Sequence, residues 1–519
     1  MSGSSSDHED EAPAGSRAGG AGRRLELPAI AVAGLYAALA LVGTLPFGVA
    51  DNGDFRRFQA HLVTGVHGPA AARPAEQEEW RRQWRALAWN RYWDLRPAEG
   101  SGPAPSREVG SVDLLWRPGV WLARRLGDGE VLDLRWLGAL PRAALLAITL
   151  GFAALCAASA RETGARAILL LALGWAALWT ATRYTIYLHS FFRETATLVF
   201  VALAVLVAGL RGRFDERAWR ISFALAVGAA ALSAPAHAPL AAVGGGVLVA
   251  AGALPAAGVV RGRRGVTGAA ALLVALAIVA VAGARSLAAT PAGIVPVNVH
   301  NSIFTGLAPS SRDAARYLGR LGFPPGAVGL VGRFAHDPEA ATLRAGRRDL
   351  FTAATWRRAL TLEPRTTLRA ILTESRHVND TSVAGHRFQS LDDAELRRAW
   401  WWNAWGELQV RLFPRGAWLW AALAALTAWA ARELSSGRRE RGGPALVVLF
   451  SALGCAVEIV VNVLGDGAAG RVRHLVAANL LLSAALLGAV WLALVVRAEG
   501  RAARRAAPPG SAGRGLSAG

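Results

Sequence analysis

The protein has 519 residues, of which 53% are hydrophobic, and its mean hydropathy is +0.30. This value is high for a soluble chain, which needs a polar surface, so the composition favours a polytopic membrane protein. The formal net charge of +20 would suit nucleic acid, but all 57 basic residues are Arg and they are scattered between apolar runs. We interpret this as a compositional bias and expect no nucleic-acid partner.

Neither cysteine predicts a disulfide or a thiolate metal site. Cys156 ends one apolar run, Cys455 lies inside another, and neither has a Cys or His close by in the sequence. Thiolate metal sites need several such ligands at short spacing. Redox chemistry is therefore not expected.

Ten apolar runs approach the length of about 20 residues that a membrane-spanning helix needs. They cover residues 28–49, 137–158, 166–183, 195–210, 219–236, 239–260, 266–286, 416–432, 444–464 and 475–496. The first starts late and is long, so we interpret it as a retained span and not a signal peptide. The breaker SAPAHAP, residues 233–239, separates the fifth run from the sixth. The sequence therefore predicts an all-α integral membrane protein with about ten transmembrane helices.

Arginines in the short loops indicate the orientation, because basic residues near span ends resist translocation. In a ten-span arrangement the Arg-rich loops all fall on one side, namely residues 159–166, 211–220, 261–264, 432–441, 497–505 and the N-terminal tail ending at Arg24. This predicts a multi-pass protein of the cell membrane with both termini in the cytoplasm. The polar clusters at the other span ends then lie outside.

The spans also predict the domain organisation. We expect a disordered cytoplasmic tail (1–24), an N-terminal module of about seven spans (25–286) with its first outer loop (50–136), a large extracytoplasmic segment (287–415), three C-terminal spans (416–497) and a disordered cytoplasmic tail (498–519).

The two long outer segments are expected to be partly helical. Residues 76–89 place Trp80, Trp84 and Leu87 on one face, which suits a helix lying along the bilayer surface. Residues 111–126 predict a second surface helix, kinked around a proline, and residues 390–413 a third with a tryptophan belt. We interpret these tryptophans mainly as membrane anchors, with a lipid or sugar platform as the alternative.

The segment DNGDF, residues 51–55, follows the first span and carries the strongest candidate chemistry. Asp51 and Asp54 converge whether the segment is a helical turn or a tight Asn-Gly turn. Neighbouring carboxylates repel, which leaves one able to accept a proton while the other orients a partner or a divalent cation. Arg56 and Arg57 follow, and guanidinium groups suit phosphate. The alternative is a solvated helix cap with arginines that reach lipid headgroups.

A second cluster lies between the third and fourth spans. Tyr187, Ser190 and Glu194 follow three- and four-residue steps, so on a helix they would share one stripe. Glu194 starts the fourth span, where a carboxylate is costly unless it lines a wet cavity or has a partner. The alternative is an acid that interacts with the helix dipole.

A third cluster lies between the ninth and tenth spans. Glycines at 465, 467 and 470 permit a tight turn with Asp466 at its tip, and Arg473 and His474 lie where the last span begins. Positive side chains at a helix start favour a bound anion, although ordinary turn chemistry also explains the pattern. Together the three clusters predict a polar cavity at the outer membrane edge.

These motifs resemble the GT-C superfamily of polytopic membrane glycosyltransferases. The resemblance rests on DNGDF after span one, on the turn Y-x-x-S-F-x-x-E, and on a late G-D-G-x-x-x-x-x-x-H segment. More narrowly, the chain looks like bacterial proteins assigned to surface-glycan hexose transfer. The resemblance implies a sugar donor on a polyprenyl phosphate and an extracytoplasmic glycan, lipid or protein acceptor.

The resemblance also implies roles for individual residues. Asp51 would be the general base that activates the acceptor, and Asp54 its orienting partner. Substrate binding would involve Arg56, Arg57, Arg473 and His474 at the lipid phosphate, Tyr187, Ser190 and Glu194 at the sugar, and Asp466 at the turn. A divalent cation at the two aspartates would need further ligands that the sequence does not indicate nearby.

Two other functions stay open at this point. A transporter or flippase for lipid-linked sugars or anionic solutes would need ionisable residues deep in the spans, and Glu458 is the main exception to otherwise uncharged spans. A membrane scaffold that binds a partner through its outer segments would not depend on the DNGDF carboxylates.

Overall fold

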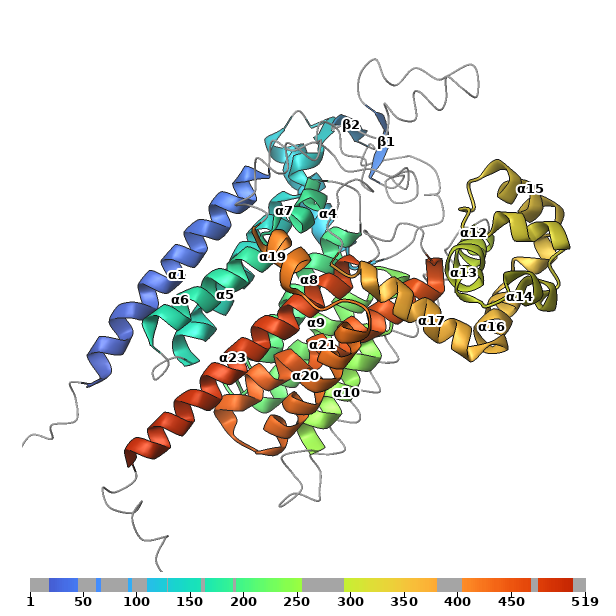
Figure 1. The fold of residues 1–519 in the computed structure, drawn as a ribbon. Helices are drawn as coiled ribbons and strands as arrows, with labels where there is room; N and C mark the ends of the chain where they lie inside the picture. Colours follow the sequence, from blue (N-terminus) through green and yellow to red (C-terminus); the bar gives the residue numbers. More distant parts are fainter. Residues whose placement is uncertain are drawn as a thin grey trace, which may run out of the picture.

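The structure is a computed structural model, and it describes residues 18–44, 62–66, 92–95, 110–127, 129–159, 164–189, 193–253, 294–379, 404–467 and 475–506. These residues are mostly helical and form a bundle of long helices, with a small sheet over one end and a compact group of short helices beside it (Figure 1).

The long helices occur where the sequence predicts spans. They are α1 (Ala18–Gly43), α5 (Ala139–Ser159), α6 (Ala165–Trp179), α8 (Glu194–Gly209), α9 (Glu216–Ala231), α10 (Leu240–Ala253), α20 (Ala417–Ser435), α21 (Arg439–Asp466) and α23 (Val476–Ala506). The predicted seventh span, residues 266–286, lies outside the described residues. The helices α1 and α23 extend beyond the predicted spans toward the chain ends.

Four helices of the described part are long and apolar enough to cross a membrane. They cover Leu134–Ala158, Ala165–Leu188, Arg439–Gly465 and Val476–Arg505, and the shorter apolar helices Leu27–Gly43, Glu194–Gly209 and Leu240–Gly252 accompany them. The protein is therefore a mostly helical membrane protein, and the total of ten spans stays a prediction.

The bundle has two chemically different ends. We call the upper end the one where α6, α9 and α21 finish and α8 begins, and the lower end the one where α8 finishes and α21 begins (Figure 1). Arginine-rich loops meet at the lower end: Arg439 donates to the Gly212 carbonyl oxygen, and Arg438 and Arg441 both donate to Glu499. The structure thus brings together loops that the sequence assigns to one side.

Helix α21 is the axis of the bundle, since it packs against α8, α10, α20 and α23. Its contact with α8 depends on glycine. A Cβ added to Gly443 of α21 would overlap the carbonyl oxygen of Gly209 of α8. On the α23 side of α8, a Cβ on Gly209 would lie 3.1 Å from the Trp491 ring. Small residues allow such close backbone approach between membrane helices.

A three-stranded antiparallel sheet corrects the prediction of an all-α protein. The strands β1 (Val63–Val66), β2 (Tyr92–Leu95) and β3 (Val131–Asp133) pair in the order β1-β2-β3. Each strand has only three or four residues, which is too short for an alternating pattern to be recognised.

Between β2 and β3 lies α4 (Asp113–Leu126), which confirms the predicted helix around Pro118. The short helical turn η2 (Leu134–Trp136) then leads into α5. In α4, Trp116 is buried in the core while Trp121 is 57% exposed. Only Trp121 is therefore available as the surface anchor that the sequence suggested.

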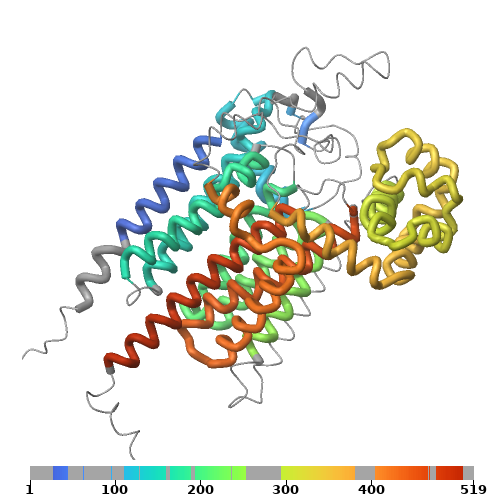
Figure 2. Tube along the Cα trace, in the orientation of Figure 1, coloured from blue at the N-terminus to red at the C-terminus, as the bar shows by residue number. Residues whose placement is uncertain are grey.

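Residues 294–379 form a group of short helices that we call the side domain, beside the upper end of the bundle (Figures 1 and 2). Its elements are α12 (Ile294–His300), the π-helix η5 (Asn301–Leu307), α13 (Ala308–Ser310), α14 (Ala314–Leu321), η6 (Pro325–Leu330), α15 (Pro338–Gly346), η7 (Arg348–Leu350), α16 (Ala353–Leu362), α17 (Pro364–Glu374) and η8 (Ser375–His377). Further short helices at the upper end are α7 (Thr182–Thr185), η3 (Ile186–His189), η4 (Pro235–His237) and α19 (Ala404–Leu412). The predicted helical character of this segment is confirmed.

The glycine contact between α8 and α21 predicts opposite effects for two Gly→Ala changes. Gly443→Ala is expected to lower the stability of the purified protein by about 1 to 3 kcal/mol, because the new methyl group must displace backbone. Gly228→Ala in α9, where nothing lies within 4 Å of a new Cβ, should be neutral or raise stability by about 0.5 to 1 kcal/mol. Thermal unfolding in one detergent checks both, and equal effects would contradict the packing described.

Candidate functional site

The centre of the upper end is a buried ion pair between two helices far apart in the sequence. His237, in the η4 turn between α9 and α10, places Nδ1 2.8 Å from Oε2 of Glu458 on α21. The two side chains are 9% and 0% exposed. The prolines of SAPAHAP make the turn that places this histidine, as the sequence predicts. A carboxylate in such surroundings persists only with a partner, and His237 is that partner.

Further polar groups surround the pair. Asn462, one turn along α21, donates from Nδ2 to the Glu458 backbone oxygen at 2.7 Å and lies 3.4 Å from Oε2. Arg193 and Glu194, at the start of α8, are close enough to His237 to interact with it electrostatically. The other carboxylate oxygen, Oε1 of Glu458, has no hydrogen-bond partner among the described residues. The cluster thus retains one acceptor that is available for a proton or a donor.

A second polar cluster joins α7, α19 and α23. The Gln409 Oε1 atom accepts from Arg183 at 2.6 Å and lies 3.2 Å from the Tyr184 hydroxyl, while Nε2 donates to the Ser483 hydroxyl. The Ser483 hydroxyl in turn donates to the Asn479 carbonyl oxygen at 2.7 Å. Gln409 is 0% exposed, so this amide of α19 connects α7 with the first turns of α23 at the upper end.

The upper end of α21 is tied to the side domain. Near the helix end, the Leu464 carbonyl oxygen accepts from the Ser302 hydroxyl at 2.6 Å and from the Trp356 indole N–H at 2.8 Å. Gly467 follows with φ +57, and a Cβ there would overlap the Asn301 carbonyl oxygen of the π-helix. Only glycine combines this backbone conformation with so close an approach. The glycine-rich turn after α21 therefore begins against the side domain.

Three of the predicted site residues fall in the described part. Tyr187 is 1% exposed, and its carbonyl oxygen accepts from the Thr195 hydroxyl at 2.7 Å. Glu194 is the first residue of α8, as predicted. Asp466 is the last residue of α21, so it ends the helix instead of lying at the tip of the turn, which begins at Gly467. The Asp466 side chain is not described.

The remaining predicted residues lie outside the described residues: Asp51, Asp54, Arg56, Arg57, Ser190, Arg473 and His474. Their positions thus stay predictions. Tyr187 lies in η3 and Glu194 in α8, which are separate elements of the described part. Both cysteines are free and buried, and no group of three metal-binding side chains occurs in the described ranges.

In the sequence His237 lies in the SAPAHAP turn and Glu458 in the ninth apolar run, and no local pattern pairs them. They are 221 positions apart, and no local spacing rule connects residues at that separation. One signal was present: each is an ionisable side chain in or between otherwise apolar runs, where a lone charge is costly. Two such residues at the same predicted membrane edge are natural partners.

His300 is a second buried histidine, at the junction of α12 and the π-helix. Its ring stacks on Phe304 with centroids 4.6 Å apart, and Nε2 lies 3.1 Å from the Arg333 carbonyl oxygen. Since a carbonyl can only accept, Nε2 carries the proton, and Nδ1 has no partner among the described residues. Burial lowers the pKa of His300 to about 4, so the ring is neutral at physiological pH.

Comparison with known proteins agrees with a membrane protein of this kind. A family model described as YfdI N-terminal transmembrane domain matches residues 23–344. Among solved structures, the archaeal oligosaccharyltransferase AglB from Archaeoglobus fulgidus, in complex with an inhibitory peptide and a dolichol-phosphate, is similar at 13% identity with a TM-score of 0.36. That alignment covers 93% of this chain and 52% of that chain, so the chain spans about half of its length. No curated protein matches.

The buried ion pair predicts a partial rescue. His237→Ala should lower stability by about 3 to 5 kcal/mol, because it leaves the Glu458 carboxylate buried and uncompensated. Adding Glu458→Gln to His237→Ala should recover part of this loss, since the stranded charge is then removed. Thermal unfolding of the two single variants and the double variant measures the coupling.

The exposed pair Arg333–Glu339, with an N–O distance of 3.0 Å and side chains 44% and 69% exposed, supplies the control. Glu339→Gln should change stability by less than about 1 kcal/mol. Strictly additive effects at His237 and Glu458 would show that the pair does not stabilise the bundle.

His300 predicts a specific pH dependence. Since the unfolded chain takes up a proton near the ordinary histidine pKa of about 6.5 and the folded protein only near pH 4, stability should be full above that range and fall as the pH drops from 6.5 to 4. His300→Gln, which keeps a donor for the Arg333 carbonyl, should flatten this part of the profile. Unfolding of the full chain at a series of pH values tests it, and parallel profiles would contradict it.

Proposed function

Because this chain belongs to the YfdI N-terminal transmembrane domain family, we propose that it is a membrane glycosyltransferase of the GT-C type. It moves a hexose from a polyprenyl-phosphate-linked donor to a cell-envelope glycan, lipid or protein on the extracytoplasmic side. The upper end is the working end, and both termini are cytoplasmic. The domain organisation follows the sequence prediction, except that α1 and α23 extend into the predicted tails 1–24 and 498–519. The side domain belongs to the large extracytoplasmic segment in this proposal.

One observation carries the proposal: buried polar side chains, among them His237, Glu458 and Gln409, gather at the upper end, whereas the arginines of the lower end pair with more exposed glutamates. The residues of two predicted clusters, Glu194 and Asp466, begin and end helices at this upper end. The third predicted cluster, DNGDF, lies outside the described residues. It follows α1 in the sequence, and α1 ends at Gly43, so the proposal places it at the same end of the bundle.

The chemistry of the proposal is a glycosyl transfer in which atoms and charges balance. The acceptor hydroxyl oxygen bonds to the anomeric carbon, and the bond from that carbon to the phosphate oxygen breaks. The polyprenyl phosphate leaves with the electron pair, and Asp51 takes the acceptor proton. Asp54 orients Asp51, and the stereochemical outcome stays open.

The remaining residues bind substrate in this proposal. Arg56, Arg57, Arg473 and His474 neutralise the phosphate that leaves. Ser190 and Glu194 contact the sugar. Asp466, at the end of α21, also binds the substrate. Tyr187 is buried, so in this proposal it stabilises the turn that precedes Ser190. A divalent cation at Asp51 and Asp54 would supply further neutralisation of the phosphate.

A transporter of lipid-linked sugars is the second candidate, because a His–Glu pair inside a helix bundle is also what proton-coupled transport uses. The pair has the geometry of a structural contact, since Glu458 is 0% exposed and held by two side chains. Transport predicts equilibration of a labelled lipid-linked sugar across vesicles without a product, and this outcome separates the two candidates.

The proposal predicts loss of transfer in both DNGDF variants. In proteoliposomes that contain a radiolabelled polyprenyl-phosphate hexose and envelope extract as acceptor, Asp51→Asn should lower transfer by at least about a hundredfold. Asp54→Asn should lower it as well, because the base loses its orienting partner.

Asp349→Asn is the matched control, because Asp349 lies in the side domain, is 63% exposed and pairs only with a neighbouring arginine among the contacts described. It should transfer at the native rate. Full activity of both DNGDF variants would end the assignment of Asp51 as general base.

A further inference from the structure

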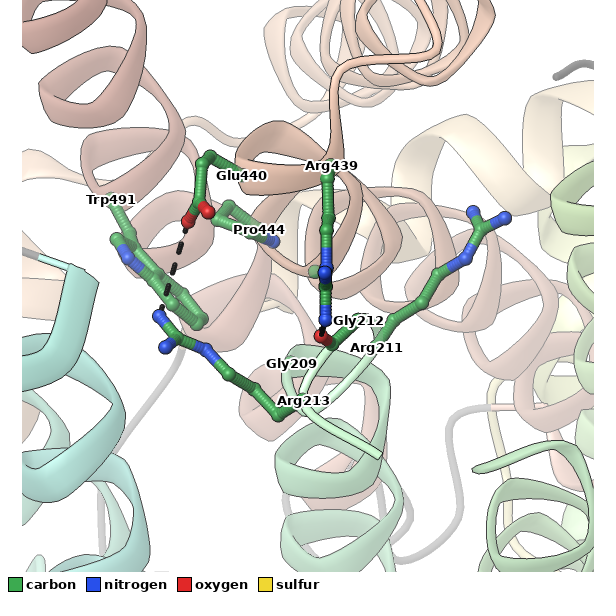
Figure 3. A pocket seen from close by; sticks show the side chains of 9 residues that line it. Gly209, Arg211, Gly212, Arg213, Arg439, Glu440, Pro444 and Trp491 are labelled. Atoms are coloured by element: carbon green, nitrogen blue, oxygen red, sulfur yellow. Dashed lines mark hydrogen bonds and ion pairs between the residues drawn. The ribbon is translucent and has the colours of Figure 1, made fainter. Parts of the chain in front are cut away.

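The lower end of the bundle holds a pocket that the proposed transfer does not use. Its volume is about 290 Å³, and it opens where α8 finishes and α21 begins (Figure 3). Its walls carry Arg211, Arg213 and Arg439 against one acid, Glu440. Three positive groups and one negative group leave a formal charge of +2 on the lining.

The three arginines differ in the contacts that their guanidinium groups already make. Arg439 donates through Nε at 3.0 Å and through Nη2 at 2.5 Å to the Gly212 carbonyl oxygen, which fixes its direction across the pocket and directs an anion to its other terminal nitrogen. The Arg213 guanidinium lies 4.0 Å from the Glu440 carboxylate beside the Trp491 ring (Figure 3). Arg211 turns away from the others and donates to the Ala251 carbonyl oxygen at 2.6 Å. Arg213 and Arg439 are thus the two groups best placed to meet an anion.

The backbone at this site adds to the positive charge. Helix α21 begins at Arg439 without a side-chain cap on its first turn, so its amide groups and the positive end of its dipole face the pocket region. Arginines at a helix start oppose that dipole, and a bound anion relieves both. Gly209 and Gly443 also line the pocket, and their close contact holds the end of α8 against the start of α21 there.

The pocket also lies where apolar helices of the bundle begin and end. The apolar helix α8 ends at Gly209, and the candidate span of α21 runs from Arg439 to Gly465. Trp491, which is 2% exposed, closes the apolar side. A basic recess between helices at the end of their apolar segments is suited to the phosphate of an anionic lipid, and a volume of 290 Å³ admits a headgroup rather than acyl chains.

We propose that this pocket binds the phosphate ester of an anionic phospholipid headgroup, held mainly by Arg213 and Arg439. The site is independent of the proposed glycosyl transfer, since it lies at the opposite end of the bundle. Its ligand is a membrane component and not a substrate.

The test uses the full chain in nanodiscs of phosphatidylcholine alone or with added phosphatidylglycerol. Lipid retained by the protein is counted by native mass spectrometry, and thermal stability is measured in parallel. The native chain should retain phosphatidylglycerol and gain stability from it. Arg213→Gln should weaken retention about fivefold, as expected for one arginine at an anionic headgroup.

Two further variants test whether the charge of the pocket itself controls lipid retention. Glu440→Gln removes the only acid of the pocket lining and should strengthen retention. Arg217→Gln carries the same charge change as Arg213→Gln at the same end of the bundle, but Arg217 is exposed and does not line the pocket. It should behave like the native chain. Equal losses in the Arg213 and Arg217 variants, or no effect of Glu440→Gln, would overturn the proposal.

A third arm identifies the source of the phosphate. Inorganic phosphate is titrated into phosphatidylcholine nanodiscs that lack anionic lipid. The proposal expects no stabilisation, because free phosphate lacks the glycerol and chains that hold the group at this depth. Stabilisation by inorganic phosphate with none from phosphatidylglycerol would assign the pocket to a soluble anion and overturn the lipid as its ligand.

Discussion

A carboxylate in the interior of a helix bundle must have a partner, and the upper half of this protein is arranged around that requirement. Glu458 is 0% exposed on the axial helix α21, and His237 reaches it from the turn between α9 and α10. Arg193 and Glu194 bring the start of α8 to the same place. A buried charge without a partner costs several kcal/mol. The contact between His237 and Glu458 therefore favours the helix arrangement in which the two side chains meet.

The same helix connects the two ends of the molecule. At its upper end the Leu464 carbonyl is held by Ser302 and Trp356 of the side domain, and at its lower end Gly443 brings it against α8. A shift of α21 along its axis would break contacts at both ends. The upper end is therefore fixed to the side domain, and the lower end has a basic recess where α8 ends and α21 begins. In the proposed function the reaction takes place at the first of these ends and lipid binding at the second.

The sequence predicted the long helices well, because an apolar run long enough to span a membrane has few alternatives to a helix. The turn at SAPAHAP and the helix start at Glu194 were also correct, since both follow from local chemistry. The small sheet was missed because its strands are three and four residues long. Trp116 was interpreted with Trp121 as a surface feature, but only packing decides which of the two is buried.

Long-range contacts were beyond the reach of local patterns. The partner of Glu458, the amide network of Gln409 and the docking of Gly467 on the π-helix each join segments more than a hundred residues apart. The candidate catalytic and substrate-binding residues were proposed from motif chemistry and resemblance. Of these, Glu194 and Tyr187 have described side chains. Tyr187 is buried, so it stabilises the turn and does not contact the substrate.

The central claim is that this protein transfers a hexose at the upper end through the DNGDF segment. The most direct measurement is mass spectrometry of envelope glycans and lipid-linked sugars in cells that lack the protein, with the native chain or Asp51→Asn restored. The account predicts that a hexose disappears from one glycan, that its lipid-linked donor accumulates, and that only the native chain repairs both. Repair by both chains, or an unchanged glycan profile, would contradict it.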